Sequence, residues 1–459
     1  MSTGITVAIV GSGPSGFYAA KELFKQEALD ATVHMFDRLP TPFGLVRGGV
    51  APDHQSIKGV VRAYQKVAAN SRFRFFGNIC LGKDLQADEL REKYDAVIWA
   101  VGNEDARKLG VPGEDLTGVH SATEFVFWYN GHPHFTNREF DLKGSQRAVV
   151  VGNGNVSMDV ARILVRSPEE LATTDIADYA LESLKDSGLT EVFVLGRRGP
   201  AQSAFSPKEI KEIAGLDDVD VLVSAADAAL DNASAEWLER GDGPRNAPKN
   251  VAFIQECAEK GGSNAPKSVR CMFLVSPIEF LGENGRLTGV RLQKNRIEER
   301  NGRLRPVATE EIWEEKADLC FKAIGYRGTP IEGVPFDDGW GIIPNEEGRV
   351  QESRDGALCQ AEYVVGWAKR GPSGLIGTNG PDSKATVLKL VEDHQAGRLT
   401  AKGVPDIEGI LTAKGSRPVS FDEWKALDAE EVRRGQAKGR VREKFVSIRE
   451  MLDVLDALQ

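Results

Sequence analysis

Two glycine-rich turns constrain the fold of this chain more than any other feature of its sequence. One begins at Gly11 and the other at Gly152, and each follows a short apolar run and precedes a run with the composition of a helix. A glycine-rich turn between a strand and a helix is the fingerprint of a β-α-β unit that binds a dinucleotide. The sequence therefore predicts two such units in one chain.

The first turn has the complete G-x-G-x-x-G spacing, with its glycines at Gly11, Gly13 and Gly16. The first glycine permits a tight turn, the second lets the backbone approach a pyrophosphate, and the third lets the helix pack on the strand. The next apolar run, 32–36, ends at Asp37, whose carboxylate can accept hydrogen bonds from both ribose hydroxyls and would repel a 2′-phosphate. We therefore expect a nucleotide with free ribose hydroxyls here, as in FAD or NAD.

The second turn differs from the first in the charge that follows it. Its sequence from Gly152 is GNGNVS, with Ser157 in place of the third glycine. The next apolar run, 191–195, leads to Arg197 and Arg198 rather than to an acid. Two guanidiniums suit the dianionic 2′-phosphate of NADP, because they can form charge-assisted hydrogen bonds with it. We therefore expect NADP at the second turn and FAD at the first, with two merely exposed arginines as the alternative.

Short apolar runs alternate with helical patterns along most of the chain, which is typical of parallel sheets with crossover helices. This pattern and the two turns predict an α/β fold with two Rossmann-like dinucleotide-binding domains. We expect surface loops at 225–250 and 261–267, and helices from about Asp422 onward. A basic stretch in this last part is expected on a solvated helix face or in a tail wrapped on the surface, and consists of Arg433, Arg434, Lys438, Arg440, Arg442 and Lys444.

The composition argues against several classes of protein. No apolar run approaches the roughly 20 residues that a membrane span needs. An apolar run follows Met1 so closely that we expect no targeting segment and a cytoplasmic location. Five cysteines without a C-x-x-C pair argue against a disulfide framework, a zinc site and a redox dithiol, so we expect no metal. The net charge of -10 disfavours nucleic-acid binding.

Further motifs resemble those of a known family. They read PTPFGLVR at 40–47, VAPDH at 50–54, GRRGP at 196–200 and GWAKRGPSG at 366–374. Together with GNGNV in the second turn, they make the chain similar to the adrenodoxin-reductase-type ferredoxin–NADP reductases over nearly its whole length. The resemblance implies an NADP domain, 105–325, inserted in an FAD domain formed by 1–104 and 326–459, the last part ending in a helical extension.

The resemblance also implies which residues contact the two cofactors. Contacts with FAD, besides the glycines of the first turn, are expected from Pro14, Ser15, Asp37, Leu45, Leu81, Trp367, Gly374, Leu375 and Ile376. Contacts with NADP are expected from Gly152, Gly154, Asn155, Val156, Arg107, Arg197, Arg198, Glu209 and Gly374.

His54, in the VAPDH motif, is the candidate catalytic residue. A lone histidine is more often structural, but the resemblance implies that His54 orients the nicotinamide or relays a proton. Its expected carboxylate partner is Glu212 or Asp159. For Glu212, a solvated position on a charged helix face is an equally good interpretation.

These features together predict a ferredoxin–NADP reductase. NADPH delivers two electrons as hydride and an iron–sulfur protein accepts one, so a flavin is needed between them. The resemblance implies a ferredoxin as acceptor and a cytochrome P450 as a downstream enzyme, and we expect a monomer or weak dimer. An acidic ferredoxin should dock on a basic surface, for which the candidates are Lys208, Lys211, Arg240, Lys369 and Arg370.

Other enzymes and proteins share part of this pattern. A thioredoxin-reductase-like enzyme needs a dithiol, and an electron-input subunit of glutamate-synthase type should carry cysteine clusters for iron–sulfur centres. The sequence has neither. A non-catalytic nucleotide-binding scaffold stays open as an alternative, although Trp367 and His54 argue against it.

Overall fold

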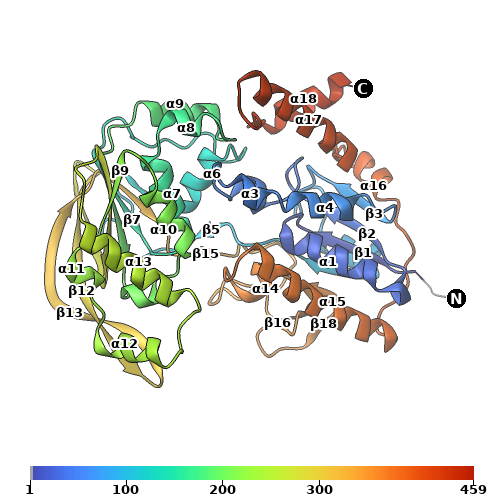
Figure 1. Cartoon of the computed structure of the whole chain (residues 1–459). Coiled ribbons are helices and arrows are strands. Elements are labelled where there is room, and N and C mark those ends of the chain that lie inside the picture. Colours follow the sequence, from blue (N-terminus) through green and yellow to red (C-terminus); the bar gives the residue numbers. More distant parts are fainter. Residues whose placement is uncertain (1–3, 459) are drawn as a thin grey trace. The chain divides into compact units, whose positions relative to one another are not determined.

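The computed structural model describes residues 4–458 and divides into two compact units. The first unit contains the described residues up to Val50, then His54–Asp105, and the residues from Gly325 onward. The second unit contains Ala51–Asp53 and Ala106–Ile324. In chain order the second unit therefore interrupts the first, and it carries the green and yellow elements of Figure 1.

The first unit is built on a seven-stranded sheet with the strand order β16-β17-β18-β4-β1-β2-β3. The strands from β18 to β3 are parallel, and β17 and β16 add an antiparallel edge. They are β1 (Thr6–Val10), β2 (Thr32–Phe36), β3 (Phe73–Phe76), β4 (Ala96–Trp99), β16 (Asn345–Glu346), β17 (Arg349–Gln351) and β18 (Leu358–Val364). Val7 and Ile9 of β1 belong to one hydrophobic core. Ala8 and Val10 belong to a second core, so the sheet is covered on both faces, as parallel sheets require.

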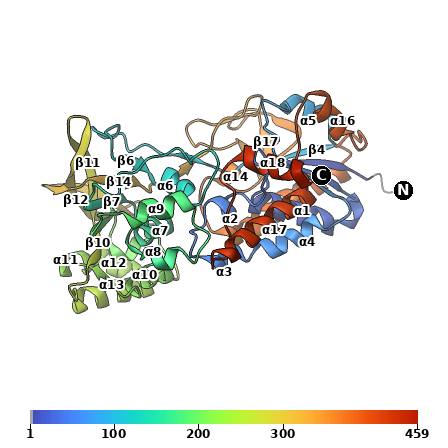
Figure 2. The same cartoon turned by 90° about the horizontal axis from the view of Figure 1, so that it is seen from above.

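The core that contains Val7 and Ile9 is completed by helices. These include α1 (Pro14–Lys25), α4 (Val61–Ala68), α15 (Asn379–Gln395), α17 (Phe421–Ala437) and α18 (Ile448–Leu458). In Figure 2 the red helix α17 runs over the blue N-terminal elements, and Trp424 and Leu427 attach it to their core. It begins after Ser420, whose hydroxyl accepts a hydrogen bond from the backbone N–H of the third helical residue. The predicted helical character of the C-terminal part is confirmed.

The basic stretch near the C-terminus is only partly a solvated helix face, in contrast to the prediction. Arg440 is buried, and Arg434 pairs with an acidic side chain of α18 at 2.8 Å. Arg442 contacts the buried carboxylate of Glu431 at 3.0 Å. The prediction failed because ion pairs among α17, α18 and the segment that joins them engage these charges, and such pairing is not visible in the composition.

The second unit contains a six-stranded sheet with the order β6-β14-β7-β8-β10-β9, and all its pairings are parallel. Its strands are β6 (Val119–Ser121), β7 (Arg147–Val151), β8 (Glu191–Gly196), β9 (Val219–Leu222), β10 (Lys267–Phe273) and β14 (Leu319–Lys322). Helices α7 (Asn155–Val165), α10 (Pro207–Ala214) and α13 (Ala247–Lys260) accompany it. Each unit thus has a parallel sheet with crossover helices, and the predicted α/β fold with two Rossmann-like domains is confirmed.

The segment 225–250 is not the surface loop that its composition indicates. It contains α11 (Ala225–Ala228) and α12 (Asn232–Glu239), and α13 begins within it. Ser224 and Asp231 start the two short helices, because their side chains accept hydrogen bonds from backbone N–H groups of the first turn.

A three-stranded antiparallel sheet in the second unit was also not predicted. It is formed by β11 (Val275–Glu283), β12 (Arg286–Arg300) and β13 (Arg303–Lys316). Its strands carry many charged residues, which hide the alternation of buried and exposed positions. Among residues 4–458, no helix has both the length and the apolar character needed to cross a bilayer.

Candidate functional site

The first glycine turn joins β1 to α1 and needs two of its glycines for the fold itself. Gly11 has a φ of +104°, and a Cβ there would lie 2.3 Å from the carbonyl oxygen of Ala100. A Cβ on Gly16 would lie 2.3 Å from the carbonyl oxygen of Gly11. Side chains at these two positions would collide with backbone, so both glycines are explained without a ligand.

Gly13 needs a different explanation. Its backbone is extended, with φ -74° and ψ -177°, and a Cβ there would meet no atom within 4 Å among the described residues. Gly13 caps the N-terminus of α1, where no side chain of residues 4–458 accepts a hydrogen bond from the first-turn N–H groups. Open space beside uncapped N–H groups at the positive end of a helix fits an anion such as the pyrophosphate of FAD.

Asp37, at the end of β2, is fixed beside this turn. Its carboxylate accepts hydrogen bonds from the backbone N–H of Ser12 at 3.0 Å and of Leu39 at 2.9 Å. Burial raises the pKa of the Asp37 carboxyl above its ordinary value, although these hydrogen bonds oppose the shift. Asp37 thus lies where the sequence predicts an acid that discriminates against a 2′-phosphate.

The PTPFGLVR segment packs directly on the first turn. The backbone N–H of Phe43 donates to the carbonyl oxygen of Ser12 at 3.0 Å, and a Cβ on Gly44 would lie 3.0 Å from the Cα of Gly13. Leu45 follows at the start of the short helix α2 (Leu45–Gly48). The structure therefore brings Leu45, an expected FAD contact, to the same end of the sheet as the turn.

Leu81, another expected FAD contact, is connected with the first turn only through its neighbours in the sequence. The segment before it passes Asp37, because the backbone N–H of Ile79 donates to the carbonyl oxygen of Asp37 at 2.9 Å. The side chain of Leu81 is partly buried against the core that contains Val10.

The GWAKRGPSG segment, which belongs to the C-terminal part of the chain, lies beside the same turn. A Cβ on Gly366 would lie 2.6 Å from the hydroxyl of Ser15, and the Ser383 hydroxyl donates to the carbonyl oxygen of Ser15 at 3.0 Å. Trp367 begins the short helix α14 (Trp367–Arg370), and Leu375 is 65% exposed. The structure thus places Gly366, which directly precedes Trp367, beside the start of α1.

Helix α15 begins at Asn379 and has Pro381 in its first turn. Proline is tolerated in the first turn, where its missing N–H has no helical acceptor.

The second glycine turn repeats the geometry of the first. Gly152 has a φ of +130°, and its Cβ would lie 2.3 Å from the carbonyl oxygen of Ala323. Gly154 has φ -99° and ψ -178°, and a Cβ there would meet no described atom within 4 Å. Asn155, at the start of α7, accepts a hydrogen bond from the backbone N–H of Ser206 at 2.8 Å. Val156 follows on α7, half-buried. Gly154 therefore leaves space for a second pyrophosphate.

Arg197 and Arg198 follow β8 and have no carboxylate partner among residues 4–458. Burial lowers the pKa of the Arg198 guanidinium, and the neighbouring charge of Arg197 lowers it further. Their backbone is fixed, since the Arg197 carbonyl oxygen accepts a hydrogen bond from the Asn295 side-chain amide at 3.0 Å. Two adjacent, uncompensated guanidiniums on a fixed turn form a site for a dianion.

Arg107 stands in a loop that is fixed by Glu114. The Glu114 carboxylate accepts hydrogen bonds from the backbone N–H groups of Leu109 and Gly110, each at 2.8 Å. It also forms an ion pair with Lys322 at 2.7 Å. The Arg107 side chain is exposed.

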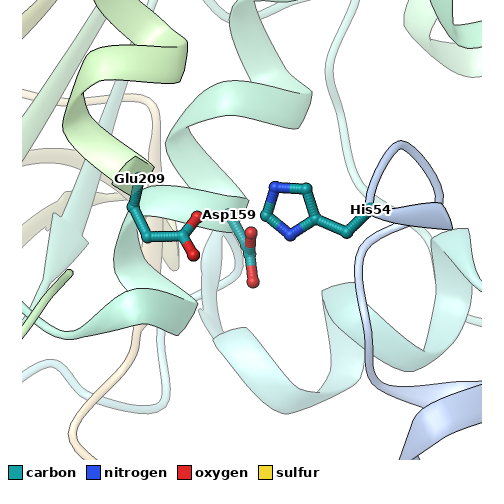
Figure 3. Close-up of side chains that lie close together, drawn as sticks. All are labelled: His54, Asp159 and Glu209. Atoms are coloured by element: carbon teal, nitrogen blue, oxygen red, sulfur yellow. The ribbon is translucent and has the colours of Figure 1, made fainter. Parts of the chain in front are cut away.

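A buried arginine on α7 gathers carboxylates, and the sequence analysis did not single it out. Arg162 donates to Asp53 at 2.7 and 3.0 Å, to Asp159 at 2.7 Å and to Glu209 at 3.2 Å. Burial alone would lower the pKa of the Arg162 guanidinium, but Asp53 and Asp159 raise it above its ordinary value. Figure 3 shows Asp159 on α7 and Glu209 on α10 side by side. A single arginine in the otherwise apolar second half of α7 is the signal that could have revealed this cluster.

The predicted catalytic residues are placed differently from one another. His54 is buried and directly follows Asp53, which Arg162 holds. Asp159 is mostly buried beside Arg162, whereas Glu212 lies 3.8 Å from Arg162, pairs with Lys208 at 3.3 Å and is 31% exposed. The carboxylate of Glu209, an expected NADP contact, is engaged by Arg162.

The candidate docking residues are also not equivalent. Lys369 and Arg370 each pair with Asp382 at 3.2 Å and are largely covered. Lys208 is about half exposed, and Arg240 pairs with an acidic neighbour on the surface. Of these four, Lys208 and Arg240 are the more accessible.

Known proteins resemble the chain over nearly its whole length. A family model described as pyridine nucleotide-disulphide oxidoreductase matches residues 5–193. The NADPH-ferredoxin reductase FprA of Mycobacterium leprae (strain TN) is 44% identical over 457 residues, covering 98% of both chains. The mitochondrial NADPH:adrenodoxin oxidoreductase of Arabidopsis thaliana is 39% identical, covering 97% of this chain and 94% of its own. The solved structure of Mycobacterium tuberculosis FprA in complex with NADPH matches with a TM-score of 0.91 and 42% identity, covering 98% of this chain and 99% of that chain.

Proposed function

The chain belongs to the family of adrenodoxin-reductase-type ferredoxin–NADP reductases, and we propose that it transfers electrons from NADPH through FAD to a ferredoxin. The observation that carries this proposal is the unlike charge at the two glycine turns. Asp37 lies beside the first turn. Arg197 and Arg198, which have no carboxylate partner among the described residues, follow the second turn. Only the second arrangement favours a phosphorylated ribose.

The two units have separate tasks in this proposal. The first unit would hold FAD between the turn at Gly13, Asp37 and the segment from Trp367 to Ile376. The second unit would hold NADPH at Gly154, Arg197 and Arg198. We assign the FAD domain to residues 1–104 and 326–459, and the NADP domain to residues 105–325. FAD, when bound, supplies the ability to accept a hydride and to release electrons singly.

The work of the protein itself is then to bind and position NADPH. The 2′-phosphate lies far from the nicotinamide, so its binding energy serves to hold the reacting ring in place. The cysteines are all free thiols, three of them buried, which does not suit disulfide chemistry and is typical of a reducing compartment. We infer that the protein works in the cytoplasm.

Replacement of His54 by alanine is expected to slow hydride transfer while the FAD content stays intact. Loss of a group that orients nicotinamide or relays a proton should reduce the rate at least roughly tenfold. Stopped-flow measurement of flavin bleaching by NADPH checks this. Ser56→Ala is the control, because Ser56 is exposed and lies in the short helix α3 (Gln55–Lys58) that directly follows His54. A His54→Ala protein that is reduced as fast as the wild type would refute the role.

The proposed acceptor is tested by NADPH-driven cytochrome c reduction with and without added ferredoxin. We expect ferredoxin to stimulate the rate, and the stimulated rate to fall as ionic strength rises, because a basic surface steers an acidic partner. Lys208→Glu should lower the stimulated rate at low salt. A rate indifferent to both ferredoxin and salt would contradict this part of the proposal.

A further inference from the structure

Helix α17 carries a carboxylate that no contact with a cofactor explains. Glu431 is fully buried in the first unit. Both of its oxygens accept hydrogen bonds from the guanidinium of Arg47, one of them at 2.8 Å. The remaining partners are the Arg442 guanidinium at 3.0 Å and the backbone N–H of Phe445 at 2.9 Å.

Glu431 stays charged in this position. Burial would raise the pKa of its carboxyl, but the guanidiniums of Arg47 and Arg442 hold that pKa below its ordinary value. A buried ion pair is not needed for stability as such, because well-packed apolar side chains often do as well. What a buried bidentate pair adds is a fixed position for both partners.

The partner that Glu431 fixes is close to the first glycine turn. Arg47 lies on α2, two residues after Leu45, and its guanidinium covers the ring of Trp424 at 5.0 Å. The same tryptophan contacts the ring of Phe43, with ring centroids 6.0 Å apart. Phe43 in turn donates its backbone N–H to Ser12 of the turn.

A continuous set of contacts therefore leads from α17 to the place where the pyrophosphate of FAD would lie. Its last step is Gly44, whose Cβ would lie 3.0 Å from the Cα of Gly13. Phe43 has a φ of +85°, a backbone conformation that a bulky residue adopts only where its surroundings hold it there. Trp424 and Arg47 are parts of those surroundings.

We infer that Glu431 is a positioning residue for FAD. Through Arg47 and α2 it holds the segment Phe43–Leu45 against the glycine turn, so that the C-terminal helices act as a clamp that strengthens the binding of FAD. The inference rests on the proposed function, because it assumes that FAD binds at this turn.

The first unit offers a matched control. Glu362 of β18 is also buried, pairs with Arg91 at 2.8 Å and accepts from the indole N–H of Trp99 at 2.9 Å. These contacts connect β18 with β4 and with α5 (Ala87–Lys93), and none of them involves the segment Phe43–Leu45. Loss of either carboxylate should lower stability, but only loss of Glu431 should loosen FAD.

The test compares Glu431→Gln and Glu362→Gln in the full-length holoprotein. Release of FAD is followed by the rise in flavin fluorescence on dilution, at a temperature where circular dichroism shows both variants folded. We expect the dissociation constant for FAD to rise at least about tenfold in Glu431→Gln and to stay within about twofold of the wild type in Glu362→Gln. The inference would be overturned if Glu431→Gln bound FAD as tightly as the wild type, or if both variants lost FAD affinity to the same extent.

A second variant covers the case in which Glu431→Gln does not fold. Arg47→Lys keeps the positive charge but loses the bidentate geometry, and should raise the dissociation constant several-fold. An unchanged constant in Arg47→Lys would then overturn the inference. A wild-type protein that holds no FAD would overturn the proposed function as well, whereas a yellow wild type with tight FAD in these variants overturns the inference alone.

Discussion

Valine in place of Gly13 is expected to give a folded protein without FAD, and valine in place of Gly154 a yellow protein that NADPH does not reduce. Both glycines have extended backbones that any residue adopts, and a Cβ at either position meets no described atom within 4 Å. The protein alone therefore tolerates a side chain there. A pyrophosphate that approaches the backbone does not.

The size of the effect follows from the hydrogen bonds that the added side chain blocks. Hydrogen bonds to a charged group contribute roughly 1.5–3 kcal/mol each, so loss of two weakens binding roughly 10²- to 10⁴-fold. The ratio of flavin to protein absorbance measures FAD, and calorimetric titration with NADP⁺ measures the second site. Gly11→Ala serves as contrast, because its Cβ would collide with the carbonyl oxygen of Ala100 and should prevent folding. If Gly13→Val kept its FAD, or if Gly154→Val lost FAD rather than NADPH, the assignment of the turns would be wrong.

Removal of both Arg197 and Arg198 is expected to abolish the preference for NADPH over NADH. The two guanidiniums have no carboxylate partner among residues 4–458, so their loss disturbs no ion pair of the protein. The 2′-phosphate, by contrast, loses two charge-assisted contacts. We expect kcat/KM for NADPH to fall roughly 10²- to 10⁴-fold, with little change for NADH.

Steady-state reduction of ferricyanide with each coenzyme measures this change. Arg296→Ala is a suitable control, because Arg296 is an exposed arginine of the same unit, and it pairs with Glu298 at 2.7 Å. A double variant that still prefers NADPH by the wild-type ratio would show that other residues read the 2′-phosphate.

The parts of the fold that depend on local pattern could be predicted from the sequence. The strand β2 has the bounds of the predicted run 32–36, and β8 extends one residue beyond the predicted run 191–195. The glycine turns were found because tight backbone geometry demands a particular residue at a particular spacing. The helices between 225 and 250 were missed because capping by Ser224 and Asp231 outweighs a loop-like composition.

Residues of the candidate site could be predicted only where a single segment of the sequence contains both the functional side chain and the strand that positions it. Asp37, Arg197 and Arg198 follow strands directly, and a strand end fixes where they lie. The contacts of Arg162 with Asp53 and of Glu431 with Arg47 were missed because the partners are far apart in the sequence. The first pair is separated by 109 positions and the second by 384. A lone arginine on an apolar helix face can indicate a buried charge, but no local pattern identifies its distant partner, because the contact arises only when the sheet and its helices bring the segments together.

The proposed function depends on FAD at the turn beside Asp37 and on NADPH at the turn before Arg197 and Arg198. Anaerobic titration of the purified protein with NADPH and, separately, with NADH tests this most directly. We expect a yellow protein whose flavin absorbance is bleached by about one equivalent of NADPH, while NADH must be added in large excess for the same effect. A colourless protein, or a flavin that NADH bleaches as readily as NADPH, would contradict it.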